Sequence, residues 1–380
     1  MRYFLIAGEA SGDLHASNLM HELRNADSEA EFCFLGGDLM LAQGGKLVKH
    51  YRDMAFMGFW NVLKNAPAVL RNINDCKKAI INFQPDVVIL IDYPGFNLRI
   101  AEFVKENLKT PVYYYISPKI WAWKESRIKD IKRYVDKIFS IFPFETEFYA
   151  RHNYQVEYVG NPTVETILNR PNQEQTFDQF CEQNNLNKKP IIAILAGSRK
   201  QEISGCLPRM IDAALIFDNY QTVISGAPGI DPLFYYKMVS GKNIPVIFGK
   251  TYELLQHSRA AIVNSGTATL ETAIVGTPQV VVYSVMLGKI AMFLGKFIVK
   301  VPYISLVNLV AGREVVKELM AHHFTVENVA KELEKLIYHQ TYRNIMSEGY
   351  KEILQTLGEP GAAERAAKSI VRELSSNKMH

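Results

Sequence analysis

Two motifs in the first half of the chain place a carboxylate directly after a run of apolar residues. Residues 3–7 are followed by Gly8-Glu-Ala-Ser-Gly-Asp13, and residues 87–91 are followed by Asp92-Tyr-Pro-Gly-Phe-Asn97. Carboxylates that follow buried parallel strands lie on the ligand side of a sheet, where they can bind hydroxyl groups or move protons. The aromatic neighbours of Asp92 would bury it and raise its pKa, which suits a general base. The alternative is a turn aspartate that bonds to its own backbone.

The loop at 8–13 is a candidate for substrate recognition. Its spacing is G-x-x-x-G, so it lacks the G-x-G-x-x-G fingerprint of dinucleotide-binding domains. Glu9 and Asp13 would repel a diphosphate in this loop, so we expect hydroxyl recognition or proton transfer. The simpler interpretation is that Ser11 or Asp13 caps the first helix.

Aromatic residues gather where the next apolar run ends, in Tyr113-Tyr-Tyr-Ile-Ser-Pro118, and just beyond it at Trp121 and Trp123. Such a cluster can stack on sugars or cover acyl chains. It can equally be ordinary core packing.

Two motifs in the second half are typical of phosphate binding. Leu195-Ala-Gly-Ser-Arg199 follows an apolar run, and its small residues would admit a phosphate to which the guanidinium can fork. Asn264-Ser-Gly-Thr-Ala-Thr-Leu-Glu271 predicts an anion site at a helix N-terminus, with Glu271 about two turns along. The alternatives are a surface ion pair between Arg199 and Glu202, and an ordinary capped helix. Neither motif is an NTPase P-loop.

No metal site is predicted. The sequence has no H-E-x-x-H or D-x-D, and its one adjacent histidine pair, His322-His323, is expected to face solvent. We therefore expect no cofactor, and phosphate charge would be met by arginine, backbone dipoles and hydroxyls.

These motifs require two α/β domains. Apolar runs recur at 3–7, 31–35, 87–91, 112–116, 137–141 and 155–159, and again at 191–195, 221–225, 260–263 and 279–283. Continuous apolar strands separated by helical patterns predict doubly wound parallel sheets. We expect one domain at 1–165 and a second at 185–357, joined by a polar linker that contains a short helix. A final helix at 361–376 packs back on the first domain, and the two domains face a central cleft.

Composition narrows the functional class. The 380 residues are 48% hydrophobic and 22% charged, with a net charge of +4, which excludes disordered chains and strongly basic nucleic-acid binders. The four scattered cysteines indicate free buried thiols in a reducing compartment. The short first apolar run predicts a strand in place of a signal peptide.

Two unusually apolar stretches, 54–63 and 285–301, predict contact with a membrane surface. Lysines of the second stretch would fall on one edge of an otherwise apolar helix, as in interfacial helices. An internal or dimer-contact helix is the alternative. The predicted contact residues are Phe56, Phe59, Trp60, Lys289, Phe293, Lys296 and Phe297.

Taken in order, the motifs resemble one family. They are A-G-E-A-S-G-D, I-D-Y-P-G-F-N, Y-Y-I-S-P-K-I-W-A-W, V-G-N-P, L-A-G-S-R, N-S-G-T-A-T-L-E and N-L-V-A-G-R-E. The set resembles the lipid-A-disaccharide synthase family over essentially the whole chain, with Ala196 where the family usually has proline. The resemblance implies a GT-B fold and an inverting, metal-independent transfer from UDP-2,3-diacylglucosamine to 2,3-diacylglucosamine 1-phosphate. It also implies a peripheral location on the cytoplasmic face of the Gram-negative inner membrane, and allows a homodimer.

The resemblance also implies roles for individual residues. Asp92 would take the proton of the acceptor 6-hydroxyl, with Glu9 as the alternative base or as the residue that orients Asp92. Donor contacts would come from Arg199, Ser265, Gly266, Thr267, Glu271, Asn308 and Arg313, the last two at the donor site or a subunit contact. Acceptor contacts would come from Ser11, Asp13, Asn97 and Ser117.

Three other functions fit parts of the pattern. Another UDP-sugar GT-B enzyme is the nearest, either a glycosyltransferase for a lipid-linked acceptor or a UDP-N-acetylglucosamine 2-epimerase. The apolar stretches argue against the epimerase, because its substrates are fully soluble. The missing dinucleotide fingerprint argues against an NAD-dependent oxidoreductase. A non-catalytic carrier would not need carboxylates at strand ends.

Overall fold

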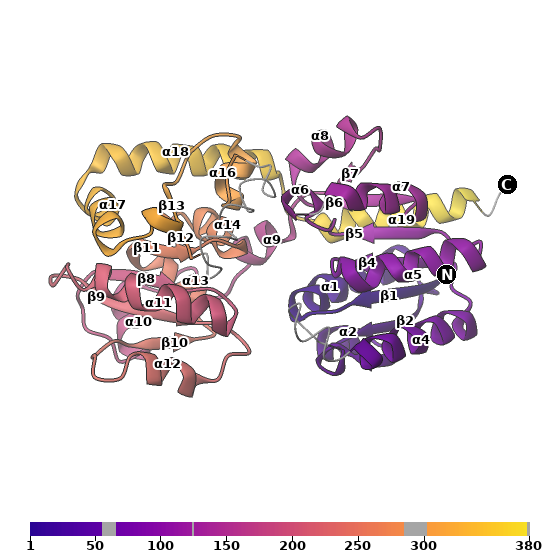
Figure 1. Cartoon of the computed structure of the whole chain (residues 1–380), viewed down its shortest axis with the longest axis horizontal. Helices are drawn as coiled ribbons and strands as arrows, with labels where there is room; N and C mark the ends of the chain where they lie inside the picture. The colour runs from indigo at the N-terminus through magenta and orange to yellow at the C-terminus, as the bar shows by residue number, and fades with distance from the viewer. Residues whose placement is uncertain (55–65, 124, 285–301, 378–380) are drawn as a thin grey trace. The chain divides into compact units, whose positions relative to one another are not determined.

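The computed structural model describes residues 1–54, 66–123, 125–284 and 302–377 (Figure 1). All seven predicted membrane-contact residues lie outside these ranges. Within them, no helix is long and apolar enough to cross a membrane.

The chain forms two compact units, one of residues 1–162 with 359–380 and one of residues 163–358. The last helix, α19 (Ala362–Asn377), lies along α1 (Ala10–Ala26) of the first unit. Lys137 joins this helix to the sheet, because its Nζ lies 2.7 Å from Glu373 and 2.8 Å from Glu157. The short helix expected in the polar linker is α10 (Phe177–Gln183), and it belongs to the second unit.

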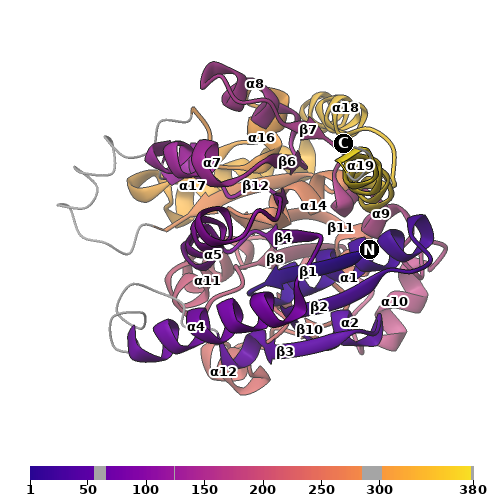
Figure 2. The same cartoon turned by 90° about the vertical axis from the view of Figure 1, so that its right-hand side faces the viewer.

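The first unit is a parallel sheet of seven strands in the order β3-β2-β1-β4-β5-β6-β7. Helices α1 and α19 cover one face, and α4, α5 and α7 cover the other (Figure 2). The strands are β1 (Arg2–Ala7), β2 (Glu31–Gly36), β3 (Lys46–His50), β4 (Val87–Ile91), β5 (Val112–Tyr115), β6 (Lys137–Ser140) and β7 (Glu157–Tyr158). The other helices are α2 (Asp38–Ala42), α4 (Ala66–Phe83), α5 (Pro94–Asn107), α6 (Ile120–Trp123), α7 (Ile128–Tyr134) and α8 (Pro143–Arg151), with 3₁₀ turns at Tyr51–Asp53 and Glu125–Arg127.

The second unit is a parallel sheet of six strands in the order β10-β9-β8-β11-β12-β13. Its strands are β8 (Ile191–Leu195), β9 (Gln221–Gly226), β10 (Val246–Phe248), β11 (Ser258–Asn264), β12 (Gln279–Tyr283) and β13 (Glu318–Met320). Its other helices are α9 (Pro162–Leu168), α11 (Lys200–Ala214), α12 (Pro232–Met238), α13 (Thr251–Gln256), α14 (Thr267–Val275), α16 (Leu306–Ala311), α17 (Val326–Tyr338) and α18 (Gln340–Leu357), with a 3₁₀ turn at Ala321–His323.

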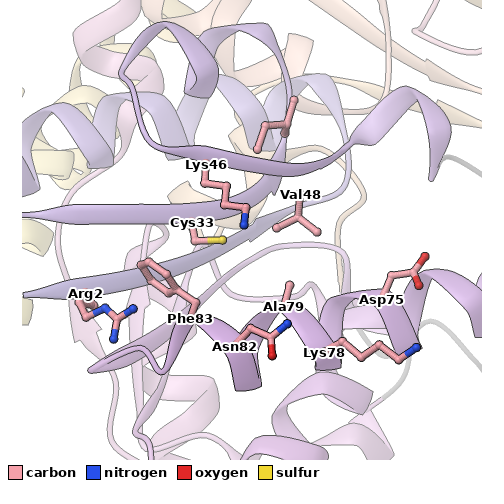
Figure 3. A pocket seen from close by; sticks show the side chains of 10 residues that line it. Arg2, Cys33, Lys46, Val48, Asp75, Lys78, Ala79, Asn82 and Phe83 are labelled. Atoms are coloured by element: carbon pink, nitrogen blue, oxygen red, sulfur yellow. The ribbon is translucent and has the colours of Figure 1, made fainter.

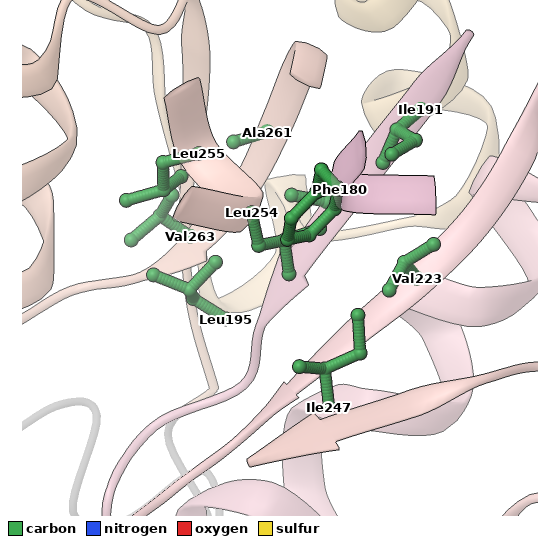
Figure 4. Close-up of a cluster of buried hydrophobic side chains, with 10 residues drawn as sticks. Phe180, Ile191, Leu195, Val223, Ile247, Leu254, Leu255, Ala261 and Val263 are labelled. Atoms are coloured by element: carbon green, nitrogen blue, oxygen red, sulfur yellow. The ribbon is translucent and has the colours of Figure 1, made fainter. Parts of the chain in front are cut away.

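The core of the second unit explains why the polar stretch before β8 folds. Phe180 of α10 is fully buried against Ile191 and Val223 of the sheet and against Leu254 and Leu255 of α13 (Figure 4). Burying a phenylalanine contributes about 1.5–3 kcal/mol. Cys181 of α10 is also fully buried, and Phe177 packs against the same cluster, so three apolar side chains dock this otherwise polar helix.

The fold class and the continuous apolar strands are confirmed. Three strands were not predicted. β3 reads Lys-Leu-Val-Lys-His and lies half-exposed at a sheet edge, while β10 and β13 have only three residues each. All four cysteines are free and buried, as expected.

Candidate functional site

The first candidate site lies where the strand order of the first sheet reverses. The chain passes from β1 to β2 and β3 on one side, and then returns to β4 on the other side of β1. Ala7 pairs with Ile91 at the carboxyl ends of β1 and β4, so Glu9 and Asp92 follow neighbouring strands at this point. Ligands of open α/β sheets bind at such a switch point. The two predicted carboxylates are therefore brought to one edge.

Gly8 allows the two loops to pack directly on each other. A Cβ on Gly8 would lie 2.4 Å from two atoms of the Tyr93 ring, so only glycine fits beneath this ring. Burial raises the pKa of Tyr93, and the charge of Glu9 raises it further. Glu9 is the N-cap residue of α1 and therefore precedes the helix that opens at this edge.

Asp92 lies in a turn that the surrounding residues hold. Asp92 and Tyr93 have φ values of +42° and +45°, a left-handed conformation that costs about 1–2 kcal/mol per residue. Asn97 donates from Nδ2 to the carbonyls of Ile91 at 3.2 Å and Asp92 at 2.8 Å, and the Tyr114 hydroxyl also donates to the Asp92 carbonyl. Burial raises the pKa of the Asp92 carboxyl, opposed by the charge of Lys119 and by the Tyr93 N–H. The carboxyl therefore has the electrostatics expected of a general base.

Two residues expected to contact the acceptor serve the fold. Asn97 is fully buried, and its amide nitrogen is used by the two carbonyls of the Asp92 turn. Asp13 is 3% exposed and accepts from the backbone N–H groups of Gly37, Leu39 and Met40 at 2.7–3.1 Å. It therefore caps the start of α2, and it does not cap α1 as the simpler interpretation held. Both side chains therefore have structural roles, and the acceptor contacts expected of them stay predictions.

Ser117 is also held within the protein. It is 3% exposed, and its hydroxyl lies 2.7 Å from that of Tyr149 on α8. Ser11 differs, because it is exposed in the first turn of α1 at the switch point. Among the predicted acceptor residues, Ser11 alone is exposed in the structure.

The aromatic residues of β5 and of the segment that follows it belong mainly to the hydrophobic core. Tyr113, Tyr114 and Tyr115 are at most 3% exposed, and Trp121 is 8% exposed. Trp121 donates from Nε1 to the carboxylate of Glu145 on α8 at 3.0 Å. Burial raises the pKa of Glu145 to about 7, although hydrogen bonds from Ser140 and Trp121 oppose the rise. Sequence reasoning missed Glu145, because Pro-Phe-Glu reads as an ordinary helix start.

The second candidate site lies at the corresponding point of the second sheet. The strand order reverses between β8 and β11, which carry the two predicted phosphate-binding motifs at their carboxyl ends. Gly197 has a φ of +111°, and a Cβ there would lie 2.7 Å from Glu202 Oε2 and 2.8 Å from Asn264 Nδ2. Glycine therefore lets the two loops meet.

Arg199 forms an ion pair with Glu202, which was the alternative to a phosphate-binding role. Its Nη1 lies 3.1 Å from Glu202 Oε1, and its side chain is 62% exposed. Exposed pairs of this kind contribute about 0–1 kcal/mol. The pair therefore leaves the guanidinium able to turn toward a phosphate.

The start of α14 is the anion-binding feature of this edge. Gly266 and Thr267 are exposed at the first turn of this nine-residue helix. Free N–H groups and the helix dipole favour an anion there. The Ser265 hydroxyl donates to the carbonyl of Ile304 at 2.9 Å. The lone pairs of the Ser265 oxygen can therefore still accept a hydrogen bond from a hydroxyl or N–H group of a ligand. Glu271, one turn further along α14, has a pKa raised to about 7 by burial.

Asn308 supports this edge from inside. It is fully buried, donates to Val316 O and Glu318 Oε1 at 2.9 Å, and accepts from the N–H groups of Val315 and Val316. Glu318 in turn accepts from the N–H of Ile304, whose carbonyl holds Ser265. Asn308 therefore positions this edge, and the contact expected of it at the donor site or a subunit contact stays a prediction.

Arg313 lies on the surface of the second unit. Its guanidinium pairs with Glu352 of α18, and both side chains are about half-exposed. The role expected of Arg313 at the donor site or a subunit contact stays a prediction.

Within the described ranges, no group of three or more histidine, cysteine or acidic side chains is placed to hold a metal ion. His322 and His323 are exposed.

A cavity of about 540 Å³ lies between α4 and the β2–β3 edge, with Arg2, Lys46 and Lys78 in its wall (Figure 3). Neither Glu9 nor Asp92 lines it, so it is separate from the first candidate site.

Solved structures with low sequence identity share the whole fold. The UDP-GlcNAc 2-epimerase from Neisseria meningitidis, bound to UDP-GlcNAc, aligns with a TM-score of 0.68 at 14% identity, covering 99% of this chain and 100% of that one. A glycosyltransferase from Rickettsia africae aligns with a TM-score of 0.58 at 11% identity, covering 99% of each chain. These likenesses confirm the GT-B fold and show the fold alone.

Sequence comparison is more specific. A family model described as lipid-A-disaccharide synthetase matches residues 3–372. The lipid-A-disaccharide synthase of Myxococcus xanthus is 39% identical over 380 residues, covering 98% of this chain and 97% of that protein. That of Syntrophus aciditrophicus is 35% identical over 370 residues, covering 96% and 95%. The chain belongs to the lipid-A-disaccharide synthetase family.

Proposed function

We propose that this glycosyltransferase joins UDP-2,3-diacylglucosamine to 2,3-diacylglucosamine 1-phosphate, giving a β-1,6-linked disaccharide 1-phosphate and UDP. The proposal rests on the side chains found where the strand order of each sheet reverses. One of these points holds a half-buried aspartate with a raised pKa, and the other holds an exposed helix start beside an arginine. A base for a hydroxyl and a cradle for a diphosphate are the two parts that such a transfer needs.

The donor would bind to the second unit. The first N–H groups of α14 and the Arg199 guanidinium would hold the diphosphate, and the helix dipole would stabilise it as a leaving group. Glu271 would bind the ribose. These groups meet the diphosphate charge without a metal ion, so metal independence is part of the proposal.

The acceptor would bind to the first unit, with its 6-hydroxyl at Asp92. As the hydroxyl oxygen bonds to C1 of the donor sugar, its proton passes to the Asp92 carboxylate. The bond between C1 and the UDP oxygen breaks, and its electron pair leaves with UDP. Attack from the face opposite UDP inverts the anomeric centre and gives the β linkage. Glu9 would orient the acceptor or Asp92, and it is the alternative base.

The acylated substrates give the protein a reason to contact a membrane. We propose peripheral association with the cytoplasmic face of the inner membrane through the apolar stretches at 54–63 and 285–301. A homodimer, with Arg313 at the subunit contact, is part of the same proposal.

The other functions are less well supported. The epimerase likeness stands at 14% identity and concerns the fold, whereas relatives at 35–39% identity are named lipid-A-disaccharide synthase. The dinucleotide fingerprint of an NAD-dependent oxidoreductase is missing, and a carrier needs no carboxylate with a raised pKa at a strand end.

UDP release tests the proposal. Purified protein in detergent receives UDP-2,3-diacylglucosamine with and without 2,3-diacylglucosamine 1-phosphate, in the presence of EDTA. We expect acceptor-dependent release that survives EDTA. Turnover of plain UDP-N-acetylglucosamine, without release from the acylated pair, would replace the proposal with the epimerase. Release abolished by EDTA and restored by a divalent cation would overturn the metal-free mechanism.

A further inference from the structure

Two cations after β5 have no partner that explains their position. Lys119 is exposed just before α6, and Arg127 is half-buried at the end of the 3₁₀ turn before α7. Within the described ranges, neither side chain makes a hydrogen bond or an ion pair with the protein. A guanidinium has five N–H donors, and a half-buried one is normally paired with an anion.

Both cations lie close to the Asp92 turn. The N–H of Asp92 donates to the carbonyl of Ile116, three residues before Lys119, at 3.3 Å. The charge of Lys119 acts on the carboxyl of Asp92, and the charge of Arg127 acts on the buried phenol of Tyr114, which itself donates to the Asp92 carbonyl. The backbone bond between Asp92 and Ile116 brings the start of the segment that carries Lys119 to the Asp92 turn, and Arg127 acts on the tyrosine whose hydroxyl holds that turn.

Residues next to each cation are anchored in the fold. Tyr149 of α8 contacts the hydroxyl of Ser117 at 2.7 Å, and Glu145 of the same helix accepts from Trp121 at 3.0 Å. Ile128, which follows Arg127, is buried. A cation presented from such a segment can recognise a ligand without first being ordered.

The acidic residue nearest to Arg127 in the sequence is already engaged. Glu125 lies 3.1 Å from Nε2 of His152, so the turn does not neutralise its own arginine. The site therefore offers the Arg127 guanidinium to an external anion, with the Lys119 ammonium group as a second positive charge that also acts on Asp92 and Glu145.

We propose that Arg127, assisted by Lys119, binds the 1-phosphate of the acceptor sugar. The inference rests on the proposed function, in which Asp92 engages the 6-hydroxyl and no residue has yet been assigned to the phosphate. A guanidinium forks to two oxygens of a phosphate monoester, and a lysine adds a point charge. Holding the acceptor at both ends would orient its hydroxyl toward the base.

The test pairs variants with two acceptors. One acceptor is 2,3-diacylglucosamine 1-phosphate, and the other is 2,3-diacylglucosamine with a free 1-hydroxyl, in the same micelles. For Arg127→Gln we expect kcat/KM to fall about 10- to 100-fold on the phosphorylated acceptor and less than about threefold on the hydroxyl acceptor. Lys119→Gln, at an exposed position, gives a smaller loss with the same selectivity. Arg127→Lys, which keeps the charge but loses the fork, should lie between wild type and Arg127→Gln.

Arg133→Gln is the matched control. Arg133 is an exposed arginine of α7 that lies over the ring of Tyr134, and its replacement should leave the acceptor preference unchanged. Equilibrium binding of the two acceptors without donor gives a second measure of the preference, independent of turnover.

The outcomes separate this inference from the proposed function. The phosphate contact is overturned if Arg127→Gln lowers kcat/KM equally on both acceptors. It is also overturned if Arg127→Gln and Lys119→Gln both keep the wild-type preference for the phosphorylated acceptor. In either case, turnover by the wild type still supports the proposed function. Lost binding to anionic phospholipid vesicles with an unchanged acceptor preference assigns the cations to lipid headgroups and also overturns the phosphate contact. Absence of acceptor-dependent UDP release by the wild type removes the proposed function, and the inference with it.

Discussion

The ring of Tyr93 lies against Gly8 so closely that a Cβ on the glycine would stand 2.4 Å from two ring atoms. This contact joins the loop after β1 to the loop after β4. Because Tyr93 follows Asp92 in a left-handed turn, the glycine also helps to determine where the Asp92 carboxyl lies.

Gly8→Ala should therefore displace Tyr93 and disturb Asp92. Overpacking of this kind costs about 1–3 kcal/mol. We expect a lower free energy of unfolding in urea and a lower kcat. Gly95→Ala is the control, because a Cβ there would meet nothing within 4 Å at the second residue of α5. A Gly8→Ala variant as stable and active as Gly95→Ala would contradict the packing argument.

Asp92→Asn should abolish most of the turnover. Loss of a general base lowers kcat by about 10²- to 10⁴-fold. Since burial raises the pKa of Asp92 above its ordinary 3.8, the active carboxylate form is lost as the pH falls through that raised value. The acid limb of the kcat/KM profile should therefore lie above pH 3.8 and disappear in the variant. If Glu9→Gln lost turnover and Asp92→Asn retained it, the two roles would be exchanged.

The sequence predicted the two edges well because their signals are local. Continuous apolar runs end at Ile91 and Leu195, where the strands β4 and β8 end. A loop after a buried parallel strand can only emerge at the carboxyl edge of the sheet. The positions of Asp92 and the Gly197 loop therefore followed from one-dimensional patterns.

The tasks of Asp13, Asn97 and Asn308 could not be predicted in the same way. Each is a polar residue in or beside a motif, and each satisfies backbone groups from a segment distant in the sequence or the next turn. Buried backbone N–H groups must be paired, but the sequence does not reveal which side chain pairs them. Sequence analysis also missed Arg127. Only the structure shows that this arginine is half-buried and has no protein partner among the residues that it describes.

Asn308→Ala should destabilise the second unit more than it affects chemistry directly. It leaves the N–H of Val315 and of Val316 without their acceptor, and each unsatisfied group costs about 1–3 kcal/mol. We expect a clear drop in the urea midpoint. Arg313→Ala breaks only an exposed pair with Glu352, so its stability should change by less than about 1 kcal/mol. Lost activity in a stable Arg313→Ala variant would support the proposed subunit contact, whereas full activity would argue against it.

Glu145 should make the stability of the first unit depend on pH. Its carboxyl is 1% exposed, and burial raises its pKa from an ordinary 4.5 to about 7. Between these values the folded state retains a proton that the unfolded state has released. The stabilisation is complete below pH 4.5 and is lost as the pH rises through about 7, a difference of at most about 3 kcal/mol.

Glu145→Gln removes this titration and keeps an oxygen acceptor for Trp121. The free energy of unfolding should therefore fall less between pH 5 and pH 8 in the variant than in wild type. All three tryptophans, Trp60, Trp121 and Trp123, belong to the first unit, so fluorescence in urea follows that unit. Glu271→Gln is the control, because Glu271 also has a raised pKa but lies in the second unit. Equal pH slopes for wild type and Glu145→Gln would show that Glu145 stays ionised in the folded protein, held by Ser140 and Trp121 against its burial.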